Sequence, residues 1–193
     1  MTLIGLAGRK GSGKDTVGAY LVERYGYKRE SFAEPLKVSA AAALNIPAEW
    51  WERAKNDPTA SVIFEHGSEM VRLTAREFLQ RYGTEAHRDV FGASFWTDML
   101  IQKIAGDESD IVITDMRFEN ETRAVKEAGG ITFLIDRPGT DEGDAHASEV
   151  LPPEDLIDYV IPNVGSIADL FRAVDAVLDG LMLEPLVSSE VVA

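Results

Sequence analysis

The stretch Gly8-Arg9-Lys10-Gly11-Ser12-Gly13-Lys14-Asp15-Thr16 carries the strongest structural signal in the chain. It follows Leu3–Ala7, an apolar run that predicts a buried strand, and it precedes Val17–Tyr25, whose pattern predicts a helix. Glycines let such a loop turn tightly, so that several backbone N–H groups face one phosphate, and the helix N-terminus adds its positive dipole end. This context predicts a phosphate-binding loop in which Lys14 reaches the β- and γ-phosphates of a nucleotide.

The residue after the loop lysine departs from the usual pattern. Ser or Thr normally follows that lysine and ligates Mg²⁺, whereas here Asp15 follows Lys14 and Thr16 comes one position later. The sequence leaves two interpretations of Asp15 open. It is either a group in the metal shell or a negative charge that favours the helix N-terminus.

Composition bounds the class of protein. The chain has 193 residues, of which 45% are hydrophobic and 27% charged, which is typical of a soluble globular protein with one sizeable core. It has no cysteine, which excludes disulfides and thiolate zinc sites and fits a reducing cytosol. We find no apolar run near the ~18 residues of a membrane span and no signal peptide, and we expect a cytoplasmic protein.

The net charge of −14 is unevenly distributed. Residues 138–193 contain 12 acidic residues and one basic residue, Arg172, whereas residues 1–137 contain 21 acidic and 18 basic residues. An acidic protein repels a nucleic-acid backbone. The arginines cluster in the half that holds the phosphate loop. We therefore expect small phosphorylated ligands, with no nucleic-acid or membrane partner, and the sequence leaves a homodimer open.

Strand and helix patterns alternate along the chain. Strands are predicted at 2–7, 27–32, 110–114, 131–136 and 157–161, and helices at 14–25, 34–44, 47–55, 74–82, 86–105, 117–128 and 167–179. Two helices begin with a capping box, at Thr74 with Glu77 and at Ser166 with Asp169. Five strands with intervening helices predict an α/β fold, a five-stranded parallel sheet wound by helices on both faces.

The spacing of the strands predicts one domain with excursions. Residues 34–108 form a helical insertion between the second and third strands, longer than an ordinary crossover requires. Residues 137–150 are rich in Gly, Asp and Glu and predict a short lid, with a disordered acidic loop as the alternative. Residues 180–193 predict a frayed tail.

Chemically capable groups follow the third predicted strand and lie in the insertion. Asp115 ends an apolar strand, where phosphate-loop proteins hold Mg²⁺, although it could also cap the next helix. Arg117 comes two residues later, at the strand ends where ligands bind in open α/β sheets. The insertion carries Arg81 and Arg88, which could grip a monophosphate, together with Glu85 for a base or sugar hydroxyl and Trp96 for stacking on a base.

Arg137 ends the fourth strand and predicts a contact to the phosphates of ATP. The stretch Asp136–Gly139 is similar to a GTPase switch, but the chain has no Asn-Lys-x-Asp motif, which argues against a GTPase. The three histidines lack the spacing of a metal site.

Taken together, the chain resembles the bacteriophage deoxynucleoside monophosphate kinases. The resembling stretches, which span residues 8–149 in order, are the phosphate loop, Ser31–Lys37, Leu79–Arg88 with Trp96, Thr114–Glu121 and His146–Glu149. Phosphomevalonate kinases share a similar loop ending, and dephospho-coenzyme A kinases share the general layout.

The resemblance implies an adenylate-kinase-like fold that uses ATP with Mg²⁺ to phosphorylate a deoxynucleoside 5′-monophosphate. The alternatives are a kinase for phosphomevalonate or dephospho-coenzyme A, and a nucleotide-binding module without turnover. Lys14, Arg88, Asp115 and Arg137 are the expected catalytic residues, and Thr16 and Asp115 the expected metal ligands. The expected ATP site is Gly11, Ser12, Gly13, Lys14, Asp15, Thr16 and Arg137, and the expected monophosphate site is Lys37, Arg81, Glu85, Arg88, Trp96 and Arg117.

Overall fold

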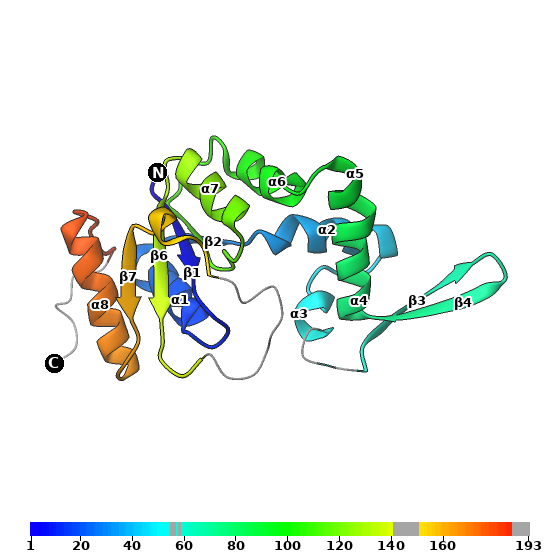
Figure 1. Cartoon of the computed structure of the whole chain (residues 1–193), viewed down its shortest axis with the longest axis horizontal. Coiled ribbons are helices and arrows are strands. Elements are labelled where there is room, and N and C mark those ends of the chain that lie inside the picture. The colour runs from blue at the N-terminus through cyan, green and yellow to red at the C-terminus, as the bar shows by residue number, and fades with distance from the viewer. Residues whose placement is uncertain (55–56, 58, 141–150, 187–193) are drawn as a thin grey trace. The chain divides into compact units, whose positions relative to one another are not determined.

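The computed structural model describes residues 1–54, 57, 59–140 and 151–186 (Figure 1). The chain divides into two compact units. The first, here called the sheet unit, consists of Met1–Ser31 and Ile101–Ala193, and the second, the inserted unit, is Phe32–Leu100. The insertion therefore begins and ends earlier than the 34–108 expected from the sequence.

The sheet unit is built on five parallel strands, as the sequence predicts. The strands are β1 (Leu3–Ala7), β2 (Lys28–Glu30), β5 (Ile111–Ile113), β6 (Ile131–Asp136) and β7 (Tyr159–Pro162). Their order is β2-β5-β1-β6-β7, with every neighbouring pair parallel. All five residues of β1 are buried because this strand lies at the centre of the sheet. The phosphate loop therefore begins at the middle of the sheet.

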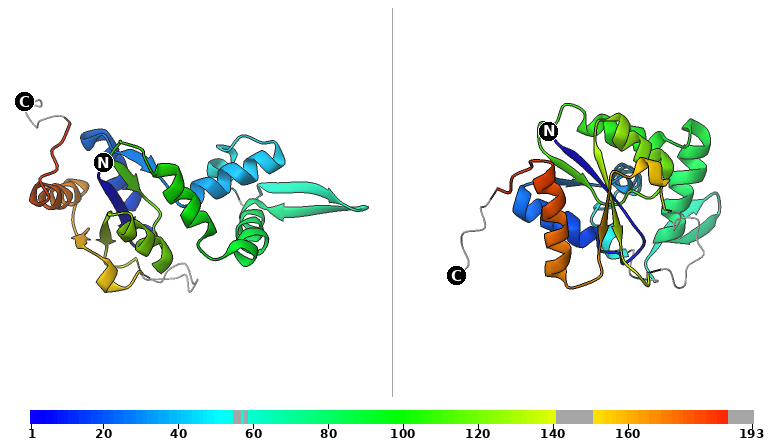
Figure 2. Two further views of the ribbon diagram at one scale, coloured as in Figure 1. Left: turned by 90° about the horizontal axis from the view of Figure 1, so that it is seen from above. Right: turned by 60° about the vertical axis from the view of Figure 1, so that its left-hand side comes forward.

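Helices cover both faces of the sheet, which confirms the predicted winding (Figure 2). On one face, α1 (Lys14–Tyr25) and α8 (Ile167–Gly180) pack onto the sheet through one buried apolar cluster. On the opposite face, α7 (Glu119–Glu127) approaches Gly5 of β1 so closely that an added Cβ would lie 3.2 Å from the Val125 side chain. Successive residues of β1 therefore face opposite helix layers, one formed by α1 and α8 and the other by α7.

The start signals of two helices are confirmed. The Ser166 hydroxyl accepts from the Asp169 N–H at the start of α8, and Thr74 does the same for Glu77 at the start of α4 (Ala75–Gln80). In both cases the acidic side chain accepts from the N–H of the capping residue, at 2.8 Å. These reciprocal bonds satisfy N–H groups that a helix start would otherwise leave open.

The inserted unit is not entirely helical, contrary to the prediction. It contains α2 (Ala33–Leu44), α3 (Trp50–Ala54) and α4, but β3 (Ser61–His66) and β4 (Glu69–Thr74) form an antiparallel hairpin between α3 and α4. The hairpin is mostly exposed, with Ile63 and Met70 on its surface. Its residues therefore lack the clean apolar–polar alternation by which a half-buried strand is recognised.

The helix predicted over residues 86–105 is interrupted. A π-helix (Arg81–Arg88) continues α4 and is followed by α5 (Asp89–Phe91), after which α6 (Phe95–Ile104) begins anew. The break falls at Gly92, whose φ of 107° is outside the helical region and favours glycine. Apolar residues recur at helical spacing on both sides of Gly92, and the sequence therefore predicts one continuous helix.

Residues 181–186 of the predicted frayed tail are held by backbone hydrogen bonds, and residues 187–193 of that prediction lie outside the described residues. The N–H of Leu183 donates to the Leu178 carbonyl, and the N–H of Leu186 donates to the Arg24 carbonyl at 2.9 Å. The Leu186 side chain lies over Gly26, where an added Cβ would come within 2.4 Å of it. A separate short 3₁₀ turn, Glu154–Leu156, precedes β7. Within the described residues, no helix combines the length and the apolar character needed to cross a membrane.

Candidate functional site

The phosphate loop connects the carboxyl end of β1 to the first residue of α1. Gly8, Gly11 and Gly13 all have positive φ, at 142°, 79° and 108°. A Cβ at Gly8 would lie 2.6 Å from the Ile135 carbonyl and from the Ser12 hydroxyl, so the loop conformation excludes a side chain there. The sequence-predicted loop is thus an ordered turn between a central strand and a helix.

Two features of this loop suit an anionic ligand. The Ser12 hydroxyl is buried, and among the described residues it has no hydrogen-bond partner. Gly13 caps α1 and has no side chain that could accept from the N–H groups of the first helical turn. A buried unsatisfied hydroxyl is costly, and open N–H groups at a helix start attract anions. The residues present therefore fit a bound phosphate group.

Lys14, the first residue of α1, lies directly over the loop. Its ammonium group donates to the Gly8 carbonyl and, at 2.8 Å, to the Arg9 carbonyl. Thr16 lies in the same first turn and is half-buried. The candidate cation and the candidate metal ligand are thus both held at the helix start.

Asp115 and Arg117 follow β5, the strand next to β1. The register pairs Gly5 with Ile113, so the residues after β5 lie beside the root of the phosphate loop. Asp115 is half-buried and Arg117 is exposed. The buried carboxylate of Glu121 accepts from the Arg117 N–H at 2.7 Å and thereby fixes the turn that carries both residues.

Arg137 lies beside the phosphate loop and follows β6, which pairs with β1 on the side opposite β5. Its guanidinium donates to the Gly11 carbonyl at 3.3 Å. Of the predicted lid, only residues 137–140 are described, and there the Thr140 hydroxyl donates to the Arg137 carbonyl at 2.8 Å. Residues 141–150 of that prediction lie outside the described residues.

Sequence reasoning missed Asn163, which also supports the loop. Its side-chain amide donates to the Ser12 carbonyl at 2.8 Å, and its backbone N–H donates to the Asp136 carbonyl at 2.7 Å. The residue follows β7, so no sequence motif near the loop points to it. The one sequence signal that could have identified Asn163 as a site residue is its position at the carboxyl end of a strand.

Asp15 has a partner that neither interpretation anticipated. Its carboxylate, in the first turn of α1, forms an ion pair with Arg29 of β2. Arg29 also donates through Nε to the Thr114 hydroxyl at 3.1 Å. Arg29 was therefore missed as a residue of this region, because it is distant from the loop in sequence and belongs to no motif.

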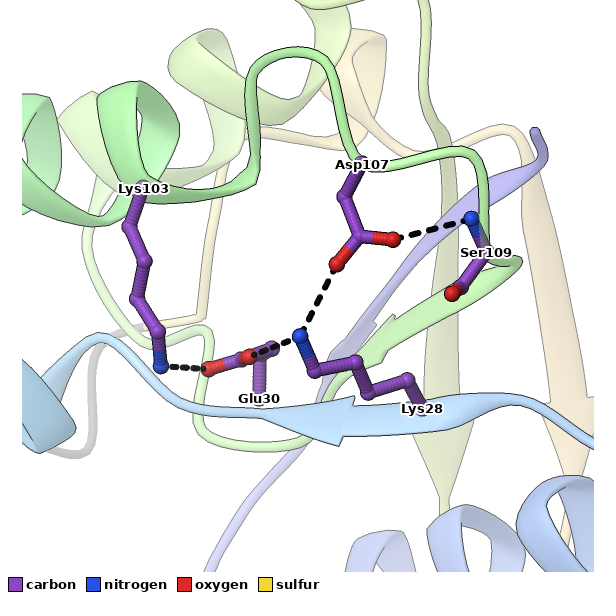
Figure 3. Close-up of polar contacts among 5 residues, drawn as sticks. All are labelled: Lys28, Glu30, Lys103, Asp107 and Ser109. Atoms are coloured by element: carbon purple, nitrogen blue, oxygen red, sulfur yellow. Dashed lines mark hydrogen bonds and ion pairs between the residues drawn. The ribbon is translucent and has the colours of Figure 1, made fainter.

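A separate charged network holds β2 in place (Figure 3). The buried carboxylate of Glu30 forms ion pairs with Lys103 at 2.6 Å and with Lys28 at 3.4 Å. Lys28 also forms an ion pair with Asp107 at 2.8 Å. The hydrogen bonds from Lys28 and from Ser109 hold the pKa of the Asp107 carboxyl well below its usual range, and the same contacts to Asp107 and Glu30 raise the pKa of Lys28. This network fixes an edge strand and touches none of the predicted site residues.

The remaining candidates belong to the inserted unit, and three of them share the π-helix. Arg81 and Glu85 are exposed there, and Arg88, its last residue, is half-buried. Single π-helical turns are rare and are frequent at functional sites. The nearby His87 ring forms a hydrogen bond with the Tyr82 carbonyl at 2.6 Å and packs against the rings of Tyr82 and Trp96.

Trp96 and Lys37 are placed differently from expectation. Trp96 is only 3% exposed, its indole N–H donates to the Gly83 carbonyl at 3.0 Å, and its ring packs against His87 and Phe95. It is therefore part of the core of the inserted unit, and this burial argues against the prediction that it stacks on a base. Lys37 forms an ion pair with Glu52, which leaves its side chain largely covered.

The predicted site residues thus form two groups. The sheet unit brings together the loop residues, Asp15, Thr16, Asp115, Arg117 and Arg137, at the carboxyl ends of its strands. The inserted unit carries Arg81, Glu85 and Arg88 on one element and Lys37 on another. No group of three or more His, Cys, Asp or Glu side chains suited to a metal ion occurs among the described residues.

Comparison with known proteins adds sequence relatives. A family model described as deoxynucleotide monophosphate kinase matches residues 46–174. A protein of Acanthamoeba polyphaga mimivirus, provisionally named as a deoxynucleotide monophosphate kinase, is 32% identical over 197 residues, with 93% of this chain and 97% of that protein covered. The deoxynucleotide monophosphate kinase of Enterobacteria phage T4 is 23% identical, with 90% and 97% covered.

Among solved structures, the chain is similar to TT1252 from Thermus thermophilus. The TM-score is 0.50 at 23% sequence identity, and the match covers 93% of this chain and 97% of that chain. At this level of identity the likeness concerns the fold alone.

Proposed function

Because the chain belongs to the deoxynucleotide monophosphate kinase family, we propose that it transfers the γ-phosphoryl group of ATP to the phosphate of a deoxynucleoside 5′-monophosphate. The observation that carries this proposal is the phosphate loop, with its buried unpartnered Ser12 hydroxyl and Lys14 over the loop carbonyls. In the reaction the bond from the γ-phosphorus to the β–γ bridging oxygen breaks and a bond to an acceptor phosphate oxygen forms. The products are ADP and a deoxynucleoside diphosphate.

We propose that the sheet unit binds ATP. Lys14, the N–H groups of Gly11 and Gly13 and the unpartnered Ser12 hydroxyl hold the β- and γ-phosphates, and Arg137 contacts the same phosphates beside Gly11. Thr16 and Asp115 would hold Mg²⁺, which supplies charge neutralisation at the transferring group. Both side chains carry oxygen, the donor that Mg²⁺ prefers, and one or two protein ligands suffice when phosphates provide the others.

We propose that the inserted unit binds the monophosphate. Arg88 and Arg81 offer guanidinium groups to its phosphate, Lys37 adds a further cation, and Glu85 accepts from a base or sugar hydroxyl. Arg117 neutralises charge at the strand ends. No general base is required, because the acceptor phosphate oxygen is already an anion at pH 7.

We further propose that the enzyme works in the cytoplasm of an infected host cell, because the relatives named above come from viruses. Its partners are then small nucleotides, and a homodimer remains compatible with the proposal. The acidic composition, with a net charge of −14, supports the absence of nucleic-acid binding.

The test is an ADP-release assay with ATP, Mg²⁺ and a panel of deoxynucleoside and nucleoside monophosphates, phosphomevalonate and dephospho-coenzyme A. We expect turnover with at least one deoxynucleotide and a loss of about 100-fold or more in Lys14→Ala, because the ammonium stabilises the transferring phosphoryl group. Lys126→Ala is the matched control, since that lysine pairs with Asp158 away from the loop. Turnover only with phosphomevalonate or dephospho-coenzyme A, or with no acceptor at all, would contradict the proposal.

A further inference from the structure

The carboxylate of Asp15 lies where a negative charge opposes phosphate binding. Asp15 directly follows Lys14 in the first turn of α1, and its side chain is 85% exposed. A triphosphate held by the loop would bring several negative charges close to this carboxylate. The cost of that approach depends on what compensates the charge of Asp15.

Arg29 provides the compensating charge, and two contacts fix it. Its Nη2 pairs with the Asp15 carboxylate, and its Nε donates to the Thr114 hydroxyl at 3.1 Å. Thr114 is itself buried and packs against Gly18 of α1, where an added Cβ would lie 2.5 Å from the threonine methyl group. The guanidinium is therefore held from both ends beside the start of α1, while 47% of its side chain stays exposed.

The fold aims Arg29 toward α1. The register pairs Arg29 with Val112, which belongs to the apolar cluster beneath α1 and α8. Its neighbours Lys28 and Glu30 point to the opposite face, where Lys103 and Asp107 bind them (Figure 3). Because that network pins the edge strand from the other side, Arg29 has a defined position relative to the phosphate loop.

We propose that Arg29 is a positioning residue of the phosphate site, which cancels the charge of Asp15 so that the loop can accept a triphosphate. The proposal rests on the proposed function, since it concerns the ATP half of the same site. An ion pair this exposed contributes little to folding. Its expected effect is therefore on ligand binding, which separates it from a purely structural role.

The proposal predicts a rescue. In Arg29→Ala the Asp15 carboxylate is uncompensated, and ATP binding should weaken about 10-fold at low salt, with a smaller loss at high salt. In the double variant Arg29→Ala with Asp15→Asn the repelling charge is absent, so ATP affinity should return to within about 3-fold of the wild type. Asp15→Asn alone should bind ATP no more weakly than the wild type.

The measurement is titration calorimetry of MgATP into the four proteins at two salt concentrations, with thermal unfolding of each. Arg123→Ala is the matched control, because Arg123 and Glu119 form a similarly exposed pair on α7 (52% and 53%). That variant should bind ATP as the wild type does. A double variant as weak as Arg29→Ala would show that Arg29 contacts the phosphates itself and would overturn the proposal, as would an unchanged affinity in Arg29→Ala.

This experiment reads binding and does not require turnover. If the wild type binds MgATP but phosphorylates no deoxynucleotide, the proposed function fails while the rescue result still decides the role of Arg29. If the wild type phosphorylates deoxynucleotides and the rescue is absent, only the role of Arg29 fails.

Discussion

At the scale of single residues, the phosphate loop is held by side chains that come from distant parts of the chain. Asn163 donates to the Ser12 carbonyl, and Arg137 donates to the Gly11 carbonyl. A Cβ at Gly13 would lie 2.8 Å from the Asn163 amide, so loop and side chain are closely fitted. Pre-positioned loop N–H groups bind phosphate without a reorganisation cost, and we expect the supports of the loop to affect ATP more than the acceptor.

Asn163→Ala tests this expectation. Losing one neutral hydrogen bond of about 1 kcal/mol should raise the KM for ATP about 5-fold, because the Ser12 carbonyl is then free to shift. The KM for the monophosphate should stay constant. Steady-state kinetics with each substrate varied in turn, together with the midpoint of thermal unfolding, provides the measurement. Equal effects on both KM values would mean that the contact only maintains the fold.

At the scale of elements, α1 and α8 are joined by a shared carboxylate. Asp175 of α8 accepts from the Tyr20 hydroxyl at 2.7 Å and from the Tyr25 hydroxyl at 2.7 Å, both of α1. The Tyr20 ring also stacks on Phe171, with centroids 3.9 Å apart. Burial is the larger cause and the hydrogen bond to Asp175 the second, and together they raise the pKa of Tyr20 to about 12. The same two causes also raise the pKa of Tyr25.

This raised pKa predicts a loss of stability in alkali. An unfolded tyrosine ionises near pH 10, so the stabilising effect is fully present below pH 10 and is lost as the pH rises toward about 12. Tyr20→Phe keeps the stacked ring but removes the ionisable group. We expect this variant to be less stable than the wild type at pH 7 and to lose less stability between pH 9 and pH 11. Urea unfolding across that pH range is the measurement, and parallel losses in both proteins would contradict the assignment.

At the scale of the whole molecule, the candidate ATP groups and the candidate acceptor groups lie in different compact units. The loop, Asp115 and Arg137 belong to the sheet unit, whereas Arg81, Glu85 and Arg88 lie on the π-helix of the inserted unit. Each unit has its own apolar core, that of the inserted unit being centred on Trp51 and Phe78. Substitutions in one unit should therefore affect one substrate selectively.

Arg88→Ala tests this division of labour. A charge-assisted contact of roughly 1.5–3 kcal/mol predicts a rise of about 10- to 150-fold in the KM for the monophosphate, with a much smaller change for ATP. Arg76→Ala, an exposed arginine of α4 in the same unit, is the control and should leave both KM values unchanged. If ATP binding suffers and monophosphate binding does not, Arg88 has been assigned to the wrong substrate.

Local signals in the sequence determined the phosphate loop, the five parallel strands and the helix starts at Thr74 and Ser166. Glycine spacing, apolar runs and capping residues act over a few positions. The parallel strands and the two helix starts are confirmed, whereas phosphate binding by the loop stays a prediction. The family resemblance also followed from short motifs, and the family match bears it out. Within the site, the sequence identified which residue types could bind phosphate, and their assignment to substrates stays a prediction.

Only the tertiary structure decided which side chains meet. The Arg29 partner of Asp15, the Asn163 support of the loop and the burial of Trp96 depend on contacts between residues far apart in the chain. The exposed hairpin and the π-helix were likewise not predicted by local signals in the sequence. A single sequence contains no record of these contacts, because packing and charge pairing are set by distances in space, which strand order and register fix only when the chain has folded.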